Sequence, residues 1–265
     1  MTKWSRPPSL QLLRAAARRR VNSESSMRVR RALAHRLNPS SEIPGDETNP
    51  LTDYFLANDG RLIHKWMHYF DIYHRHFQPY RNKPVTIVEF GVSQGGSLQM
   101  WKSYFGPQAR IVGVDINPQC ANFGEPQVEI VIGDQEDRQF LKSLANKVGD
   151  IDVLIEDGGH TMTQQIATFE ELWPNIVDGG VFLMEDLHTS YWPKYDGGLR
   201  REGTFIEYAK KLIDQQHAWR SREREFEVDE YTRSIAGMHV YDSIIVFDKA
   251  TVTRPRNKRT GTRSH

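Results

Sequence analysis

Five short apolar runs, each with an acidic residue at its end or within two residues of it, constrain this fold most. The runs are Ile87–Phe90, Ile111–Val114, Val128–Ile132, Val153–Ile155 and Val181–Met184. Runs this short and rich in valine and isoleucine predict buried strands of a parallel sheet. In such sheets ligands bind beyond the carboxyl ends of the strands, so the sequence predicts that these acidic residues gather in one crevice.

Helical patterns alternate with the strands, which predicts a doubly wound, Rossmann-like and mostly parallel α/β sheet with right-handed crossovers. The expected helices are Gln94–Tyr104, Glu136–Lys147, Met162–Trp173 and a late helix marked by Phe205–Ile213. A last strand is expected at Ser243–Asp248, next to Ile235–Tyr241, and Asp178–Gly180 is expected as a turn.

Before the sheet, residues 51–80 are predicted to be helical, because Ile63, Trp66, Met67, Phe70 and Tyr73 recur at helical spacing. We interpret this segment as a helical cap over the crevice. Its four histidines, His64, His68, His74 and His76, raise the alternative of a metal site. No acidic residue or third ligand accompanies the His64/His68 pair in the pattern, so we favour the cap.

Charge divides the chain into an acidic body with basic ends. Of the 35 Lys and Arg residues, ten lie in residues 1–37 and six in 249–265, whereas only one of the 34 acidic residues, Glu24, lies there. Residues 38–248 therefore carry a net charge of −14, which argues against a nucleic-acid partner. We predict a basic arm and linker (1–50, partly disordered), a cap segment (51–84), a central domain (85–248) and a basic disordered tail (249–265).

Composition narrows the cellular setting. No apolar run approaches the ~20 residues of a transmembrane helix, and the N-terminus lacks the apolar region of a secretory signal. The single cysteine, Cys120, excludes an internal disulfide framework and is interpreted as a small, semi-buried side chain. These features predict a cytoplasmic protein.

A glycine-rich turn follows the first strand and reads Glu89-Phe-Gly91-Val-Ser93-Gln-Gly95-Gly-Ser97. Its carboxylate would repel a pyrophosphate but attract the ammonium group of S-adenosylmethionine. Asp115 ends the second strand, where an acid can accept both ribose hydroxyls, and Asp134 follows the third strand, near the adenine. The predicted binding residues for this cofactor are Glu89, Gly91, Ser93, Gly95, Ser97, Asp115, Asp134 and Gln135.

Two alternatives stay open at this end of the sheet. Asp115 and Asp134 can be ordinary caps at strand ends. The interval from the glycine turn to Asp115 also resembles the dinucleotide pattern of NAD enzymes, although the spacing of the glycines is not G-x-G-x-x-G.

Two acidic clusters follow the fourth and fifth strands, namely Glu156-Asp157-Gly-Gly-His160 and Glu185-Asp186-Leu-His188. Asp157, Glu185 and Asp186 would form a hard site made only of oxygen ligands, which suits Mg²⁺ better than Zn²⁺. A cation would also relieve the repulsion among three carboxylates.

These motifs make the stretch from about Val85 to Asp248 similar to class I S-adenosylmethionine-dependent methyltransferases. It resembles the metal-dependent sugar O-methyltransferases, such as the mycinamicin and macrocin macrolide-sugar enzymes and mycobacterial sugar O-methyltransferases. Asp157-Gly-Gly-His160 and Glu185-Asp186 carry the resemblance. It implies that Asp157, Glu185 and Asp186 bind Mg²⁺ and that His160 is the general base.

The chemistry expected from this resemblance is methyl transfer to a hydroxyl of a sugar or oligosaccharide acceptor. Coordination to Mg²⁺ lowers the pKa of a hydroxyl, and an imidazole can then remove its proton. His188 is the rival base, and Tyr191, Trp192, Lys194, Tyr195 and Asp196 form a loop that can stack on a sugar or serve as a packed lid. Phenolic or polyketide acceptors, a non-catalytic cofactor-binding scaffold and a homodimer are further expectations to be tested.

Overall fold

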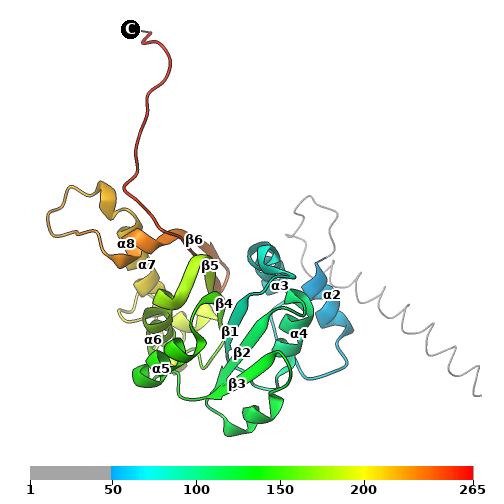
Figure 1. Cartoon of the computed structure of the whole chain (residues 1–265). Helices are drawn as coiled ribbons and strands as arrows, with labels where there is room; N and C mark the ends of the chain where they lie inside the picture. Colours follow the sequence, from blue (N-terminus) through cyan, green and yellow to red (C-terminus); the bar gives the residue numbers. More distant parts are fainter. Residues whose placement is uncertain (1–48, 265) are drawn as a thin grey trace, which may run out of the picture. The chain divides into compact units, whose positions relative to one another are not determined.

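The computed structural model, which describes residues 49–264, contains a seven-stranded sheet of order β3-β2-β1-β4-β5-β7-β6 (Figure 1). The strands are β1 (Thr86–Phe90), β2 (Arg110–Asp115), β3 (Val128–Ile132), β4 (Ile151–Glu156), β5 (Ile176–Met184), β6 (Ile235–Tyr241) and β7 (Ile244–Lys249). The first five run parallel, whereas β7 is antiparallel to both β5 and β6. The predicted doubly wound, mostly parallel sheet is confirmed.

Helices connect the strands as the apolar periodicity predicts. Those in and after the sheet region are α4 (Gly96–Phe105), α5 (Arg138–Val148), α6 (Met162–Leu172), α7 (Phe205–Gln216) and α8 (Glu230–Ser234). Short 3₁₀ helices span Gln78–Tyr80, Pro118–Phe123, Trp173–Asn175, Leu187–Tyr191, Pro193–Tyr195 and Ala218–Arg220. The four expected helices are confirmed with shifts of a few residues at their ends, as is usual for boundaries read from a pattern.

Side chains of β1 alternate between the two faces of the sheet. Val88 and Phe90 belong to the apolar cluster that α5, α6 and α7 also line. Glu89 points to the opposite face, where the indole of Trp101 on α4 donates a hydrogen bond to it. Period-two alternation therefore gives this strand one purely apolar face and one face with a buried acid.

An aromatic cluster centred on Phe169 of α6 joins this layer to the antiparallel end of the sheet. The Phe169 ring is stacked on Trp173, with centroids 5.3 Å apart, and lies 4.7 Å from Phe247 and 5.1 Å from Phe182. Tilted and edge-on aromatic pairs of this kind add to the stabilisation from burial alone. Phe169 thus fixes α6, the helix that follows the Glu156–His160 cluster, against β5 and β7.

By internal contacts the described chain divides into a small unit, residues 49–60 and 64–75, and a larger unit, residues 61–63 and 76–264. The small unit contains α2 (Pro50–Ala57) and most of α3 (Tyr69–Phe77). The Asn49 side chain caps α2 and also donates to Asp71 at 2.9 Å, and the Phe55 and Phe70 rings lie 4.8 Å apart.

The prediction of continuous helix over residues 51–80 is wrong, because residues 58–68 form no helix. The Asn58 side chain accepts the backbone N–H of Gly60 at 3.1 Å, a local turn that competes with the helix. Ile63, Trp66 and Met67 lie in this irregular stretch, so their helical spacing was coincidental. Whether the segment caps the crevice stays a prediction.

Two further sequence expectations need correction. Asp178–Gly180 is not a turn before the strand: it lies inside β5, where the pairing with β4 shifts register and Gly179 has a φ of +84°. Pro50, assigned to the linker, is instead the first residue of α2. The basic arm and the rest of that linker, residues 1–48, lie outside the described residues.

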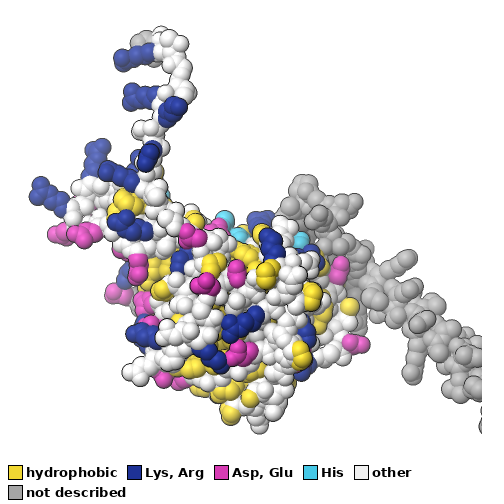
Figure 2. All heavy atoms as spheres, viewed as in Figure 1, with side chains coloured by type: hydrophobic (Ala, Val, Ile, Leu, Met, Phe, Trp, Pro, Cys, Tyr) yellow, Lys and Arg dark blue, Asp and Glu magenta, His cyan; other side chains and the backbone are white. Residues whose placement is uncertain are grey.

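After Lys249 the described chain forms no helix or strand and leads away from the sheet (Figure 1). The backbone N–H groups of Ala250 and Val252 still donate to Ser234 and Arg233. Lys and Arg side chains line the segment beyond (Figure 2). Across the described residues, no helix has the length and apolarity that crossing a membrane requires.

The aromatic cluster generates a stability prediction. Phe169→Ala removes a completely buried ring and should lower the free energy of unfolding by about 3–5 kcal/mol. Leu199→Ala, at a side chain that is 77 % exposed, is the matched control and should change it by less than about 0.5 kcal/mol. Urea unfolding followed by circular dichroism measures both values, and equal small losses would contradict the role given to Phe169.

Candidate active site

The candidate site lies where the strand order reverses. Strand β1 pairs with β2 on one side and with β4 on the other, so the loops after β1 and β4 flank a topological switch point. Crevices at such points are where doubly wound sheets bind ligands. The glycine turn follows β1 and the Asp157–His160 motif follows β4, so the structure brings both sequence motifs to this edge.

Gly91 fits closely between neighbouring strands. It has a φ of +90°, and a Cβ placed there would lie 1.9 Å from the backbone oxygen of Asp157. Its N–H donates to Val114 at 2.8 Å, and the N–H of Asp157 donates to Phe90 at 3.1 Å. Only glycine allows this approach, which holds the glycine turn directly against the backbone of Asp157.

The first residues of α4 also pack closely against the backbone of another segment, the one around Leu62. Gly95 caps the helix in a left-handed conformation, with a φ of +72°. A Cβ on Gly96 would lie 2.3 Å from the backbone oxygen of Leu62. Ser93 has a φ of +50°, an uncommon value for a residue with a side chain. The predicted turn is therefore a tightly constrained loop with the helix N–H groups beyond it.

Glu89 is completely buried. Its carboxylate accepts hydrogen bonds from the Ser97 hydroxyl at 2.8 Å and from the Trp101 indole N–H at 2.9 Å. A buried charge needs such partners, and both come from α4. Ser97 therefore binds Glu89, and no pattern in the sequence indicated the role of Trp101. The expected contact of Glu89 with an ammonium group stays a prediction.

Asp115 and Asp134 both accept backbone N–H groups. Asp115 receives those of Val92 and Ser93, each at 2.9 Å, and thereby ties the end of β2 to the glycine turn. Asp134 receives the N–H of Glu136 at 2.8 Å. These are the capping roles considered as the alternative, but a carboxylate has about four acceptor positions, so they leave room for ligand contacts.

Gln135 is a buried connector rather than an open contact residue. Its amide N–H₂ donates to Glu156 at 2.5 Å and to Thr168 at 2.8 Å, and its oxygen accepts the N–H of Gly159 at 3.4 Å. The side chain is 7 % exposed. It therefore braces the loop after β4, and its assignment to the cofactor stays a prediction.

Asp157, His160 and Asp186 form a compact group at the strand ends. Their ligand atoms all lie within 4.8 Å of one another. Nε2 of His160 is 3.5 Å from Asp186 Oδ2 and 3.9 Å from Asp157 Oδ1, and all three side chains are partly buried. The motifs after β4 and β5 thus converge on an imidazole between two carboxylates, with one face open to solvent.

The backbone at this group is strained and firmly held. His160 has a φ of +60° and Asp186 a φ of +54°. The Thr189 hydroxyl lies 2.8 Å from the carbonyl of Asp186 and 3.2 Å from that of His160. Directly after His160, a capping box between Thr161 and Gln164 starts α6. Such strain clusters at functional sites when the surrounding structure holds it in place.

Two buried glutamates lie beside the group. Glu156 is completely buried; burial raises its pKa, as does Asp157, while His160, the Gln135 amide and the Gly158 N–H oppose the rise. Its Oε2 has no hydrogen-bond partner in residues 49–264. Glu185 is also completely buried, and its backbone N–H donates to the carbonyl of Glu156. It lies outside the group formed by Asp157, His160 and Asp186.

The rival base, His188, lies in a different environment. Its Nδ1 is 3.2 Å from the Ser243 hydroxyl, and its ring packs edge-on against Trp192 with centroids 4.6 Å apart. It does not belong to the Asp157–Asp186 group. On the same loop, the Tyr195 ring lies 6.4 Å from His160 and 6.1 Å from Trp192. One aromatic ring, that of Tyr195, therefore lies next to the candidate base, and Trp192 lies between Tyr195 and the rival His188.

Sequence reasoning missed the residues that support the site. Thr168, Gln165 and Thr189 are buried polar residues on α6 and the loop after β5, and Gln165 donates to the carbonyl of Glu185 at 3.2 Å. Their signal was faint, since nothing in the sequence separates these three buried residues from partly exposed polar residues such as Gln164 and His188. Burial raises the pKa of Cys120 to about 11, with a smaller contribution from Asp115, which fits the interpretation of an inert thiol.

The fold is the Rossmann-like fold of methyltransferases, and residues 88–187 match the family described as a methyltransferase domain. The chain therefore carries a domain of this family. Within it, the chain is similar to an 8-demethyl-8-alpha-L-rhamnosyl tetracenomycin-C 2'-O-methyltransferase of Streptomyces olivaceus, at 35% identity over 67% of this chain and 49% of the relative.

Two further relatives are of the same kind. A mycinamicin VI 2''-O-methyltransferase of Micromonospora griseorubida is 35% identical over 74% of this chain and 50% of its own length. A solved structure, the MycE methyltransferase from the mycinamycin biosynthetic pathway in complex with Mg, SAH and mycinamycin VI, superposes with a TM-score of 0.68. It is 31% identical, covering 78% of this chain and 54% of that chain. The chain thus spans about half the length of the relatives it matches.

The close approach at Gly91 gives a prediction for the loop. Gly91→Ala places a Cβ against the Asp157 carbonyl and should cost about 1–3 kcal/mol of stability from backbone strain alone. Binding of S-adenosylhomocysteine, measured by calorimetry, should weaken at least about tenfold, equivalent to about 1.4 kcal/mol. The control is Gly124→Ala, where φ is −60° and the nearest atom is 3.5 Å from the new Cβ. Unchanged ligand affinity in Gly91→Ala would remove this loop from the cofactor site.

Proposed function

We propose that this protein is a Mg²⁺-dependent O-methyltransferase that moves the methyl group of S-adenosylmethionine to a sugar hydroxyl. The sugar belongs to an oligosaccharide or to a glycosylated natural product. The observation that carries the proposal is the convergence of Asp157, His160 and Asp186 at the switch point of the sheet. The sugar acceptor is supported by the relatives, whose names specify methylation of macrolide or tetracenomycin sugars.

The residues present fit a hard divalent cation. Carboxylate oxygens of Asp157 and Asp186 lie close enough to share an ion, and their mutual repulsion is relieved by one. Glu185, adjacent to Asp186 in sequence, is the third proposed ligand; it is completely buried and lies outside the group that Asp157, His160 and Asp186 form. When bound, Mg²⁺ orients the acceptor hydroxyl and makes it more acidic.

The cofactor is proposed to occupy the crevice beside the glycine turn. The left-handed loop from Gly91 to Gly95 brings backbone close to the ligand, and Asp115, tied to this loop, stands where ribose hydroxyls need an acceptor. Glu89, Ser93, Ser97, Asp134 and Gln135 complete the proposed set. The burial of Glu89 and Gln135 indicates that these two position the loop more than they cover the ligand.

His160 is the proposed general base. Its Nε2 faces the carboxylates that would fix the acceptor, so it can take the hydroxyl proton as the acceptor oxygen bonds to the methyl carbon. The carbon–sulfur bond breaks in the same step, leaving a neutral thioether. Tyr195 lies next to the imidazole and Trp192 lies beside Tyr195, so the two rings are the proposed surface on which a sugar stacks. Orientation of two bound reactants supplies much of the remaining acceleration.

The other expectations are carried forward as parts of the proposal. A phenolic or polyketide hydroxyl is the alternative acceptor, and a panel of acceptors distinguishes it. The proposed cytoplasmic setting is supported by the free thiol of Cys120. The proposed dimer is measured directly by light scattering of the full chain.

Metal removal tests the cation. EDTA should abolish transfer of labelled methyl, and Mg²⁺ should restore it, while S-adenosylhomocysteine still binds in EDTA. Asp157→Asn and Asp186→Asn should each require at least about tenfold more Mg²⁺, since each removes a proposed charged ligand. Asp150→Asn, at an exposed acid before β4, is the matched control. Full turnover in EDTA would exclude the metal role.

Replacement of the histidines tests the base. His160→Ala should lower kcat by about 10²–10⁴, the usual contribution of a general base, with cofactor binding retained. His188→Ala should keep kcat within about tenfold of wild type, because its Nδ1 lies against Ser243 instead of the carboxylates. Rates are measured at saturating acceptor over a range of pH. The opposite ranking of the two variants would transfer the role to His188.

A further inference from the structure

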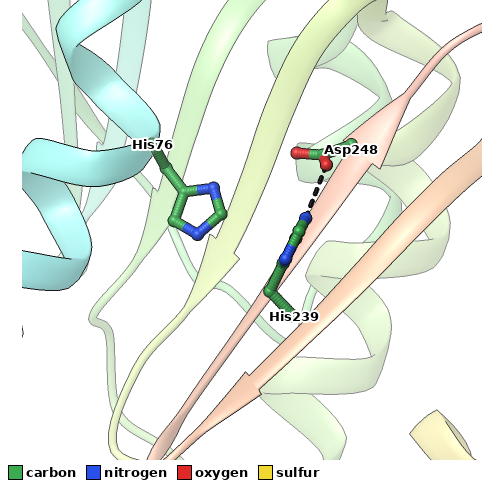
Figure 3. Close-up of side chains that lie close together, drawn as sticks. All are labelled: His76, His239 and Asp248. Atoms are coloured by element: carbon green, nitrogen blue, oxygen red, sulfur yellow. Dashed lines mark hydrogen bonds and ion pairs between the residues drawn. The ribbon is translucent and has the colours of Figure 1, made fainter.

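A second group of metal-ligand side chains lies outside the candidate active site. His76 lies in the last turn of α3, His239 on β6 and Asp248 on β7, and their ligand atoms are all within 4.8 Å of one another (Figure 3). Nε2 of His239 is 2.7 Å from Asp248 Oδ2, and the two imidazole centroids are 4.7 Å apart. All three residues belong to the larger unit.

A hydrogen bond between His239 and Asp248 explains the closeness of those two residues only. A second imidazole, brought by an element 163 positions earlier in the chain and bonded to the Tyr241 hydroxyl, lies beside the same pair (Figure 3). Ligands on one tetrahedral zinc ion lie about 3.3 Å apart. Closing the group from its present spacing therefore takes shifts of about 1.5 Å or less, within reach of side-chain rotation.

The surroundings leave room for an ion and hold one ring in place. Gly237 pairs with Asp248 across the two strands, and a Cβ there would lie 3.2 Å from Asp248 Oδ2 and 3.6 Å from His239 Nε2. A glycine at this position keeps the space before both ligand atoms open. The Tyr241 hydroxyl is 2.9 Å from Nε2 of His76, a contact of the kind that orients metal-binding histidines.

Sheet register separates this group from the candidate active site. Asp248 pairs with Val181, near the middle of β5, whereas Asp186 lies beyond the carboxyl end of that strand. The four steps along the chain from Val181 to Glu185 span about 13 Å in an extended strand. The donor sets also differ, since two imidazoles favour a borderline ion such as Zn²⁺ and the active-site carboxylates favour Mg²⁺.

We propose that His76, His239 and Asp248 bind one zinc ion, which clamps the chain entering β1 to the antiparallel edge of the sheet. The ion takes one nitrogen from each imidazole and one carboxylate oxygen. Water fills the fourth position, because the side chains of His239 and Asp248 are 42% and 39% exposed. The ion replaces the hydrogen bond between His239 and Asp248 and takes no part in methyl transfer.

Zinc stoichiometry of the full-length protein tests this site. The chain is stripped with a chelator, equilibrated with excess Mg²⁺ and dialysed against Zn²⁺, and bound zinc is counted by atomic absorption. Because zinc can also bind at His160, the comparison is between variants. Wild type and the control His217→Ala, at an exposed histidine, should hold one more zinc than His76→Ala, His239→Ala and Asp248→Asn.

Thermal unfolding provides the second measurement. At free zinc of about 100 times Kd, the Tm of wild type and His217→Ala should rise by roughly 5–10 °C more than that of the three site variants. All five proteins should keep methyl transfer in Mg²⁺, so failure here is distinguishable from failure of the proposed function. The three variants lie on three elements, so a folding defect in one leaves two to decide. Equal zinc content and equal Tm shifts in all five would overturn the proposal.

Discussion

The close backbone approach between the loops after β1 and β4 is the constraint on which the candidate site depends. Gly91 has no room for a side chain against the Asp157 carbonyl, and its N–H is held by the end of β2. Three adjacent strand ends are thereby locked together. The glycine turn and Asp157 are thereby held close together, as the proposed reaction requires of the groups that position its methyl donor and its activated hydroxyl.

The acids near the candidate site fall into two groups, which differ in burial and in hydrogen bonding. Glu89 and Glu156 are both completely buried; Glu89 accepts side-chain hydrogen bonds from Ser97 and Trp101 of α4, and Glu156 accepts one from Gln135. Asp157 and Asp186 instead flank His160 at the partly open edge. The buried acids, Glu89 and Glu156, thus hold the structure together, whereas the partly exposed acids, Asp157 and Asp186, are available to a ligand. Burial raises the pKa of Glu156, as expected for an acid of the first group.

The sequence predicted the layer architecture well because valine-rich strands and alternating helices leave strong periodic signals. Val128–Ile132 and Ile235–Tyr241 were located to the residue. The prediction went wrong where local turn chemistry outweighed the periodic signal. The Asn58 side chain forms a turn where the pattern indicated a helix, and Gly179 lies inside β5, where the register with β4 shifts. For the site, motif order placed Asp157, His160 and Asp186 together, whereas burial, which decides between bracing and binding, has no sequence signal at Glu89 or Gln135.

Strain at the site supports its assignment independently of the motifs. His160 and Asp186 both adopt left-handed backbone conformations, each costing on the order of 1–3 kcal/mol for residues of ordinary type. A fold keeps such conformations only when other contacts fix them, and here Thr189 contacts both carbonyls while Thr161 starts α6 immediately beyond. The imidazole and the carboxylate are therefore held before any ligand arrives. Preorganisation of this kind lets binding energy serve the reaction instead of ordering the site.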